Sequence, residues 1–205
     1  MKGGVYGTMD LEYWLKYIYP RIAHDLGLDI ERDRLATKLI AELGKGKLLP
    51  IDSLRFIEGR DVVVLGPFFS GNLKGDIVIT AGKSILNYDI IPDVHVTDGE
   101  EGLRILKKLE ENGTIIVLHA HGDNMEILRE VVPKLERFVA TTQVEPFDRV
   151  YNFFGFTDGD RAVMIAKYFK AKSIRIVGFD FKRAKGRKLK KLRWAEKILR
   201  MEGII

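Results

Sequence analysis

The chain has 205 residues, of which 46% are hydrophobic and 31% charged, with a net charge of +5 and no cysteine. This composition predicts an ordinary buried core, in one domain with an appendage or in two small domains, and it excludes disulfides, cysteine-ligated zinc, iron–sulfur clusters and thiol nucleophiles. No apolar run is as long as a membrane span and the N-terminus lacks a signal-peptide pattern, so we expect a soluble, cytoplasmic protein, and the many charges are typical of heat-adapted proteins.

The N-terminal quarter of the chain carries two helical patterns. Apolar residues recur at helical spacing over residues 9–27, where Pro20 should kink or interrupt the helix. A second helical pattern covers about residues 32–43. We therefore expect a helical N-terminal unit over residues 1–45, packed on an α/β catalytic domain over residues 46–205, with the whole chain as one compact domain as the alternative.

From Asp61 onward, short β-branched runs alternate with helical stretches. Most runs are continuously apolar, as in parallel strands that are covered on both faces. The alternation predicts an α/β fold, a doubly wound, mostly parallel sheet with helices on both faces. The expected strands are 62–65, 77–80, 94–97, 114–118, 138–141 and 174–177, and the expected helices are 101–112, 124–136 and 158–170.

Polar side chains and glycines directly follow most of these runs. The carboxyl ends of parallel strands meet at one edge of the sheet, where ligands bind. We therefore expect the segments behind the strands to converge on one site. They are Gly66-Pro67, Asp98-Gly99-Glu100, 119–124, Thr141-Thr142-Gln143 and 178–181.

Asp98 and Glu100 follow the third run and are two residues apart. In an extended chain this spacing puts both carboxylates on one side, as coordination of a hard cation requires. The alternative is that Asp98 caps the helix 101–112 and Glu100 lies in its first turn.

The segment His-Ala-His-Gly-Asp-Asn at residues 119–124 allows three interpretations. The first is a transition-metal site through His119 and His121. The second is a phosphate and Mg²⁺ site in which Asp123 meets the cation, and the third is one buried histidine before a helix cap at Asp123 or Asn124. We favour Mg²⁺ over zinc because oxygen ligands are plentiful and no third histidine is nearby.

Residues 152–162 combine three phenylalanines with acids and an arginine. Thr157 or Asp158 would cap the following helix, whose free N–H groups attract an anion. Arg161, one turn further, could bind a phosphate in a bidentate manner. The phenylalanines are core residues in one interpretation, and in the other one of them stacks on a flat heterocycle.

Phosphate binding is also a candidate role for two glycine-rich or basic segments. Gly66-Pro67 could let backbone amides approach a nucleotide, although neither a Walker A motif nor G-x-G-x-x-G is present, and no G-x-S-x-G indicates a serine hydrolase. Residues 182–193 hold eight cations and no acid, while the rest of the chain is slightly acidic. This segment is either a solvated helix face or a local phosphate clamp, and it does not suggest a basic surface spread over the molecule.

Taken together, the motifs resemble those of the archaeal MptE-type 6-hydroxymethyl-7,8-dihydropterin diphosphokinases, over roughly residues 60–200. The resemblance implies a fold similar to the catalytic domain of thiamin pyrophosphokinase. It also implies ATP and Mg²⁺, with AMP as the leaving product, in the folate or methanopterin branch of pterin biosynthesis. It rests on Pro92-Asp93, Val96-Thr97-Asp98, HAHGDN at 119–124, Thr141-Thr142-Gln143, GFTDGDRA at 155–162 and Gly178-Phe179-Asp180-Phe181.

The chain departs from that family at two places. The family has a G-x-G-P-S-L type loop after the first strand, where this chain keeps Gly66-Pro67 and continues with Phe68-Phe69-Ser70. It also tends toward Asp-Leu-Asp-Gly after the third strand, where this chain has Asp98-Gly99-Glu100-Glu101.

The resemblance and the motifs give each candidate residue an expected role. Asp98, Asp123 and Glu100 would hold Mg²⁺, and His119 or His121 would contact phosphate or help to deprotonate the acceptor alcohol. The expected ATP-binding residues are Arg161, Gly66, Pro67, Asn124, Thr157, Lys182, Arg187 and Lys188. For the pterin, Asp158 or Asp180 would pair with its amidine-like edge, and Phe154 or Phe156 would lie against its face.

Two other functions are compatible with parts of the sequence. A nucleotide-sugar-dependent glycosyltransferase would use the same kind of sheet and some of the same motifs. A non-enzymatic RNA-binding domain would use residues 182–193, although it leaves the acids at the sheet edge without a role. We expect small-molecule substrates, ATP and the hydroxymethyl-dihydropterin, and no membrane, and we favour these substrates over a nucleic acid. The sequence leaves a homo-oligomer open.

Overall fold

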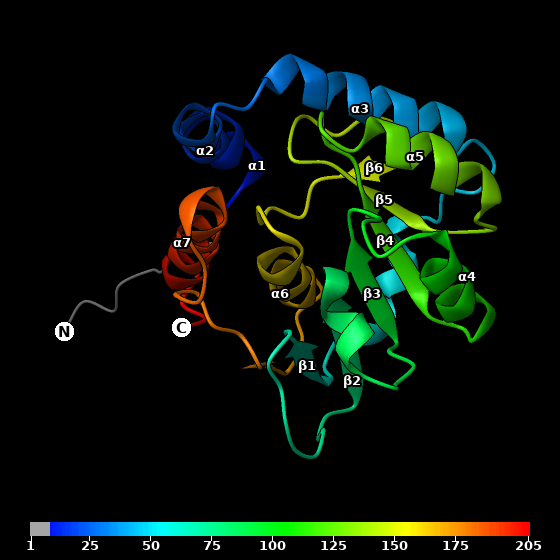
Figure 1. Ribbon diagram of the computed structural model, residues 1–205, viewed down its shortest axis with the longest axis vertical. Helices are drawn as coiled ribbons and strands as arrows, with labels where there is room; N and C mark the ends of the chain where they lie inside the picture. Colours follow the sequence, from blue (N-terminus) through cyan, green and yellow to red (C-terminus); the bar gives the residue numbers. More distant parts are fainter. Residues whose placement is uncertain (1–8) are drawn as a thin grey trace.

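In the computed structural model, which describes residues 9–205, a parallel sheet lies between two layers of helices (Figure 1). Every pairing in the sheet is parallel, and the strand order is β6-β5-β4-β3-β2-β1-β7. The strands are β1 (Asp61–Leu65), β2 (Ile77–Ala81), β3 (Val94–Thr97), β4 (Ile115–His119), β5 (Val139–Thr141), β6 (Val150–Tyr151) and β7 (Ser173–Val177). The six expected strands and the doubly wound α/β class are confirmed.

The helices begin in the N-terminal unit, whose residues 1–8 lie outside the described part of the chain. The expected interruption near Pro20 takes the form of a π-helical turn just before it, where proline cannot donate the next backbone hydrogen bond. In chain order the helices are α1 (Leu11–Tyr13), η1 (Trp14–Ile18), α2 (Tyr19–Leu26), α3 (Ile30–Leu43), η2 (Ile51–Ile57), η3 (Gly82–Asn87), α4 (Leu103–Glu111), α5 (Met125–Val131), η4 (Val132–Lys134), α6 (Asp158–Tyr168) and α7 (Gly186–Met201).

Three details differ from the expectations. The helix expected from residue 101 begins only at Leu103, after Gly102 with a φ of 90°, so the interpretation of Asp98 as its cap is wrong. The helix expected over 124–136 ends at Val131 and passes into the 3₁₀ turn η4 around Pro133. Strand β6 was not expected, because two residues are too short to produce a periodic pattern.

The sheet separates two hydrophobic clusters. Alternate residues of β4 show this, because Val117 packs with α6 on one face while Ile116 and Leu118 pack with α3, α4 and α5 on the other. Both faces are therefore covered, which explains why the strands read as continuous apolar runs.

A third hydrophobic cluster joins the N-terminal helices to the sheet domain. Trp14, Tyr19 and Ile22 are fully buried and pack with Phe156 and Met164 at α6. This contact places α1, α2 and the start of α3 at the edge of the sheet where the parallel strands end, while the rest of α3 covers one face (Figure 1).

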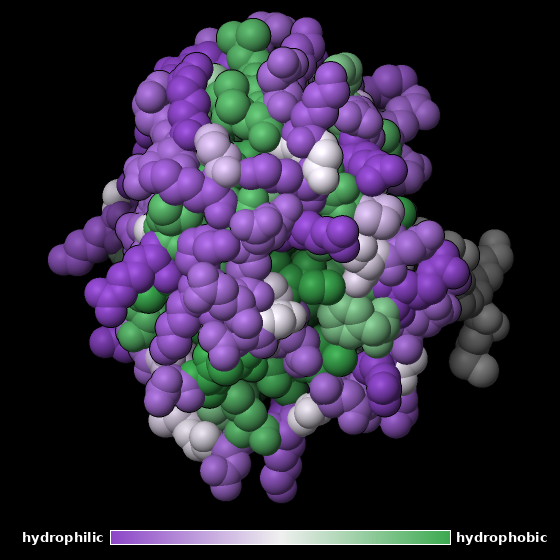
Figure 2. Space-filling model, turned by 90° about the vertical axis from the view of Figure 1, so that its right-hand side faces the viewer, coloured by the Kyte–Doolittle hydropathy of each residue, from purple (hydrophilic) through white to green (hydrophobic). Residues whose placement is uncertain are grey.

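Hydrophilic residues cover most of the face that is turned toward the viewer in Figure 2, and the hydrophobic groups there gather mainly in its lower half. None of the helices described in residues 9–205 has the length and apolar character needed to cross a membrane.

Candidate active site

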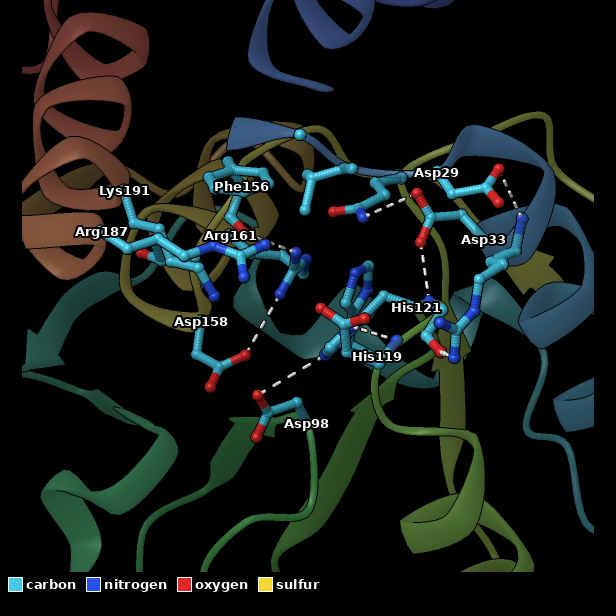
Figure 3. A pocket seen from close by; sticks show the side chains of 17 residues that line it. Asp29, Asp33, Asp98, His119, His121, Phe156, Asp158, Arg161, Arg187 and Lys191 are labelled. Atoms are coloured by element: carbon cyan, nitrogen blue, oxygen red, sulfur yellow. Dashed lines mark hydrogen bonds and ion pairs between the residues drawn. The ribbon is translucent and has the colours of Figure 1, made fainter. Parts of the chain in front are cut away.

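Two adjoining cavities open at the carboxyl edge of the sheet. The first, which we call the α3 cavity, has a volume of about 270 Å³ and is bounded by α3 and the start of α6 (Figure 3). The second, the aromatic cavity, has about 490 Å³ and lies between the ends of β1 and β7. Asp98, Thr157 and Asp158 line both cavities, so the two meet at a pair of carboxylates.

Asp98 is held at this junction by a buried network beneath its loop. Glu101 accepts a hydrogen bond from Thr97 Oγ1 at 2.7 Å and lies 2.5 Å from His95 Nε2, and the Thr97 hydroxyl in turn accepts from Gly99 N at 2.7 Å. Burial acts to raise the pKa of Asp98, but the neighbouring His121 and Arg161 outweigh it, so this pKa is lowered. Asp98 is therefore ionised at neutral pH.

The loop after β4 is tied to the loop after β3 through one amide side chain. Asn124 Nδ2 donates to Asp98 O at 2.9 Å and to His119 O at 2.8 Å, and its Oδ1 accepts from His121 N at 3.0 Å. This side chain is buried and lines neither cavity, so it acts as a brace between the two loops.

The two histidines of this loop have different surroundings. His121 Nδ1 accepts from Asp123 N at 3.2 Å, which leaves the Nε2 proton directed at Asp98, whose Oδ2 is 3.8 Å away. His119 is fully buried, and burial together with the charge of Arg161 lowers its pKa, so it is a neutral imidazole. Its Nδ1 contacts Thr141 Oγ1 at 3.0 Å, while its Nε2 has no hydrogen-bond partner in the part of the chain that the structure describes.

The start of α6 supplies the opposite wall. Asp160 is buried and accepts from Phe156 N at 2.6 Å and from Thr157 N at 2.7 Å, which fixes the first turn of the helix. Arg161, also buried, donates to Asp158 Oδ1 at 3.2 Å and to Phe156 O at 3.1 Å. Burial and the charge of Asp98 raise the pKa of Asp158 well above its ordinary value.

Helix α3 contributes residues that the sequence motifs did not indicate. Asp33 Oδ1 accepts from Gly122 N at 2.7 Å, and Arg32 Nη2 donates to Gly122 O at 2.8 Å, so α3 binds both backbone polar groups of one residue of the β4 loop. Asp33 also accepts from the Tyr19 hydroxyl and from Gln143 Nε2. Asp33 could have been found from its spacing, since it precedes the buried Thr37 and Ile40 by one and two turns on the same face.

The aromatic cavity is built where two loops pack closely. Gly66 follows β1, and a Cβ there would lie 2.7 Å from the backbone oxygen of Gly178, which follows β7. The rings of Phe179 and Phe181 are stacked with centroids 6.0 Å apart, and the guanidinium of Arg183 lies 4.5 Å above the ring of Phe68.

The basic segment is divided between the two cavities. Arg187 and Lys191, one helical turn apart on α7, line the α3 cavity. Arg183 and Lys188 line the aromatic cavity. Successive faces of one helix end thus supply cations to both sides of the junction.

The structure brings most of the expected site residues to these two cavities. The α3 cavity is lined by Asp98, His119, His121, Asp123, Phe156, Thr157, Asp158, Arg161 and Arg187. The aromatic cavity is lined by Gly66, Pro67, Asp98, Glu100, Thr157, Asp158, Asp180 and Lys188.

Three expected residues line neither cavity. They are Asn124, Lys182 and Phe154, whose ring lies against Trp14 with centroids 6.0 Å apart. Glu100 is ion-paired with Lys83 at 2.6 Å, and Asp123 is exposed. In the described residues 9–205, no three histidine, aspartate or glutamate side chains form a ready-made metal site.

A family model described as 6-hydroxymethylpterin diphosphokinase, MptE-like, matches residues 71–186, which is more than half of the chain. The chain belongs to this MptE-like family. The match includes Asp98, the loop at 119–124 and the start of α6, and it leaves out the N-terminal helices and Gly66.

Three relatives of the MptE-like chain carry the name 6-hydroxymethyl-7,8-dihydropterin pyrophosphokinase. The protein from Pyrococcus furiosus is 36% identical over 93% of this chain and 93% of its own length. The protein from Methanocaldococcus jannaschii is 35% identical over 84% of this chain and 80% of its own. The one from Methanothermobacter thermautotrophicus is 34% identical over 84% and 79%.

Proposed function

We propose that this protein is a 6-hydroxymethyl-7,8-dihydropterin diphosphokinase, which transfers a diphosphate from ATP to the hydroxymethyl group of the pterin and releases AMP. Membership of the MptE-like family and the names of the three relatives support the reaction class. The observation that carries the proposal is the junction of two cavities at Asp98 and Asp158. A transfer between two substrates needs two adjoining sites, with charged groups where the sites meet.

In this reaction the hydroxymethyl oxygen attacks the β-phosphorus of ATP and a new oxygen–phosphorus bond forms there. The bond between the β-phosphorus and the oxygen bridging to the α-phosphorus breaks, AMP leaves with that oxygen, and the alcohol proton passes to solvent water. Arg161, fixed by its bonds to Asp158 and Phe156, presents a positive charge at the junction. Catalysis of this type rests mainly on positioning and on neutralising the phosphate charges.

Asp98 and Asp158 fit the requirements of a Mg²⁺ ion. In phosphoryl-transfer sites this ion uses one or two carboxylates and takes its other ligands from phosphates and water, so three protein ligands are not needed. The proximity of the two carboxylates and the burial of Asp158 make a second negative charge unfavourable there, and a divalent cation relieves this. When bound, Mg²⁺ would neutralise the phosphates. Of the other two ligands expected from the sequence, the exposed Asp123 lines the α3 cavity, and Glu100 lines the aromatic cavity as the ion-pair partner of Lys83.

The contacts of His121 favour a donor role over proton removal. His121 accepts from Asp123 N through Nδ1, so its Nε2–H is available to Asp98 or to a phosphate. His119 is buried and neutral. Cations of the basic segment line the two cavities, which supports phosphate binding by this segment over binding of a nucleic acid.

The test is a product analysis. The protein is incubated with ATP, Mg²⁺ and 6-hydroxymethyl-7,8-dihydropterin, and nucleotides and pterins are separated and quantified. We expect one AMP for each pterin diphosphate formed, and no AMP when the pterin is omitted. Formation of ADP would indicate transfer of a single phosphoryl group, and release of AMP without a pterin product would indicate hydrolysis of ATP. Either result would refute the proposal.

A further inference from the structure

We infer that the two cavities divide the substrates between them, with the base of the nucleotide in the aromatic cavity and the pterin ring in the α3 cavity. This inference rests on the proposed function. It assigns a separate cavity to each substrate, whereas the motifs alone predicted one common site. The diphosphate to be transferred then lies at Asp98 and Asp158, which both cavities share.

The topology of the sheet favours the aromatic cavity for the nucleotide. Strand β1 has β2 on one side and β7 on the other, so the strand order reverses at β1, and the loops after β1 and β7 line a cavity at this switch point. Nucleotides bind at such crevices in open α/β sheets. The glycines at 66 and 178 allow the two loops to approach each other closely there.

Size and surface chemistry agree with the topology. The aromatic cavity, at about 490 Å³, is larger than the α3 cavity, at about 270 Å³, and the nucleotide is the larger substrate. Phe68, Phe179 and Phe181 offer flat apolar surfaces to a base, and Arg183 and Lys188 lie beside them. Stacking with nearby cations suits a purine that carries a phosphate tail.

The α3 cavity has what a small heterocycle with a hydrogen-bonding edge requires. Asp33, His119 and Gln143 are buried polar side chains at its wall, and they come from α3, the end of β4 and the segment after β5. His119 Nε2 and Arg161 Nε are buried and have no hydrogen-bond partner among residues 9–205. Buried polar atoms without a hydrogen-bond partner are rare unless a ligand or a water molecule binds them. They discriminate strongly between a ligand that can form these hydrogen bonds and one that cannot.

This division changes the roles expected for two residues. Asp180 was expected at the pterin and lies in the aromatic cavity, so it belongs to the nucleotide side. Arg187 was expected at ATP and lies in the α3 cavity, within reach of the acceptor side. Part of the pterin site therefore comes from α3, outside the segment that defines the family model.

Two neighbouring residues of α7 provide a matched test, because Lys191 lines the α3 cavity and Leu192 lines the aromatic cavity. A tryptophan at either position introduces a large ring into one cavity only. Binding of AMP and of 6-hydroxymethylpterin, each alone, is measured by isothermal titration calorimetry. Lys191→Ala controls for the lost charge, Phe68→Ala removes an exposed ring of the aromatic cavity, and thermal unfolding of each variant verifies the fold.

We expect Leu192→Trp to weaken AMP binding at least tenfold and to leave pterin binding within twofold, and Lys191→Trp to do the opposite. Two results would overturn the division of substrates alone, provided that the parent makes AMP and the pterin diphosphate. One is the reverse pattern, and the other is an AMP affinity that is unchanged in both Leu192→Trp and Phe68→Ala. A parent that binds no pterin and makes no pterin diphosphate would overturn the proposed function, and the inference with it.

Discussion

Replacing Asp33 with alanine should destabilise the whole protein, although Asp33 belongs to no recognised motif. Its carboxylate accepts from three buried or partly buried donors, Gly122 N at 2.7 Å, Gln143 Nε2 at 3.2 Å and the Tyr19 hydroxyl. Burial and the charge of Asp33 raise the pKa of Tyr19, so this hydroxyl stays protonated and donates. Asp33→Ala removes the acceptor for all three donors at once.

The expected cost follows from these bonds. A buried donor left without a partner costs about 1–3 kcal/mol, and Gln143 keeps a second acceptor in Tyr19 Oη at 2.9 Å. We therefore expect the free energy of unfolding to fall by about 3–5 kcal/mol. For a chain of this length, such a loss lowers the Tm by about 10 °C.

The assay is urea unfolding at neutral pH, followed by circular dichroism, with Glu42→Ala as the control. Glu42 is an exposed residue on the same helix, and its replacement should change the free energy of unfolding by less than about 0.5 kcal/mol. A double-mutant cycle with Tyr19→Phe measures the coupling between Asp33 and Tyr19, which bind each other and share Gln143, so the two replacements should not be additive. The reasoning is refuted if Asp33→Ala is as stable as Glu42→Ala, or if the two effects are additive.

Four further outcomes test other parts of the account. Gly66→Ala should raise the KM for ATP about tenfold and leave the KM for the pterin unchanged, because its Cβ would lie 2.7 Å from the backbone oxygen of Gly178, and steady-state kinetics with each substrate varied would show it. Asp98→Asn should lower kcat at least about 100-fold with an unchanged circular dichroism spectrum, and a parental kcat would exclude the assigned role. The Mg²⁺ affinity of the parent should increase as the pH rises through the raised pKa of Asp158, because only the ionised carboxylate binds the cation. Calorimetry should find that Asp158→Asn has lost this pH dependence. Arg34→Ala removes two exposed ion pairs, with Glu31 and Glu145, and should lower the free energy of unfolding by no more than about 1 kcal/mol, so a larger loss on urea unfolding would contradict this estimate.

The sheet and its ligand-binding edge were predictable because each strand has a local sequence pattern. Runs such as Val62-Val63-Val64 are apolar throughout, since both faces of the sheet are covered. The residues directly after such runs lie at one edge by the geometry of parallel strands, whatever the rest of the chain does. This is why Asp98 and the loop at 119–124 could be placed together from the sequence.

The contribution of α3 was not predictable by the same route. Asp33 reaches the site through contacts with residues about 90 and 110 positions away in the chain, Gly122 and Gln143, and no local pattern encodes such distances. The separation into two cavities likewise depends on how α7 lies across the sheet edge, which periodicity does not determine. Phe154 illustrates the converse, because its place in a motif suggested a ligand and its ring packs against Trp14.

The central claim is that two substrates meet at the carboxylates of Asp98 and Asp158. A crystal structure of the protein with Mg²⁺, 6-hydroxymethylpterin and α,β-methylene-ATP, in which the scissile bridge cannot break, tests it most directly. The account predicts the pterin hydroxyl next to the β-phosphorus, with both aspartates at the phosphates. Ligands bound in positions that do not share these two carboxylates would contradict it.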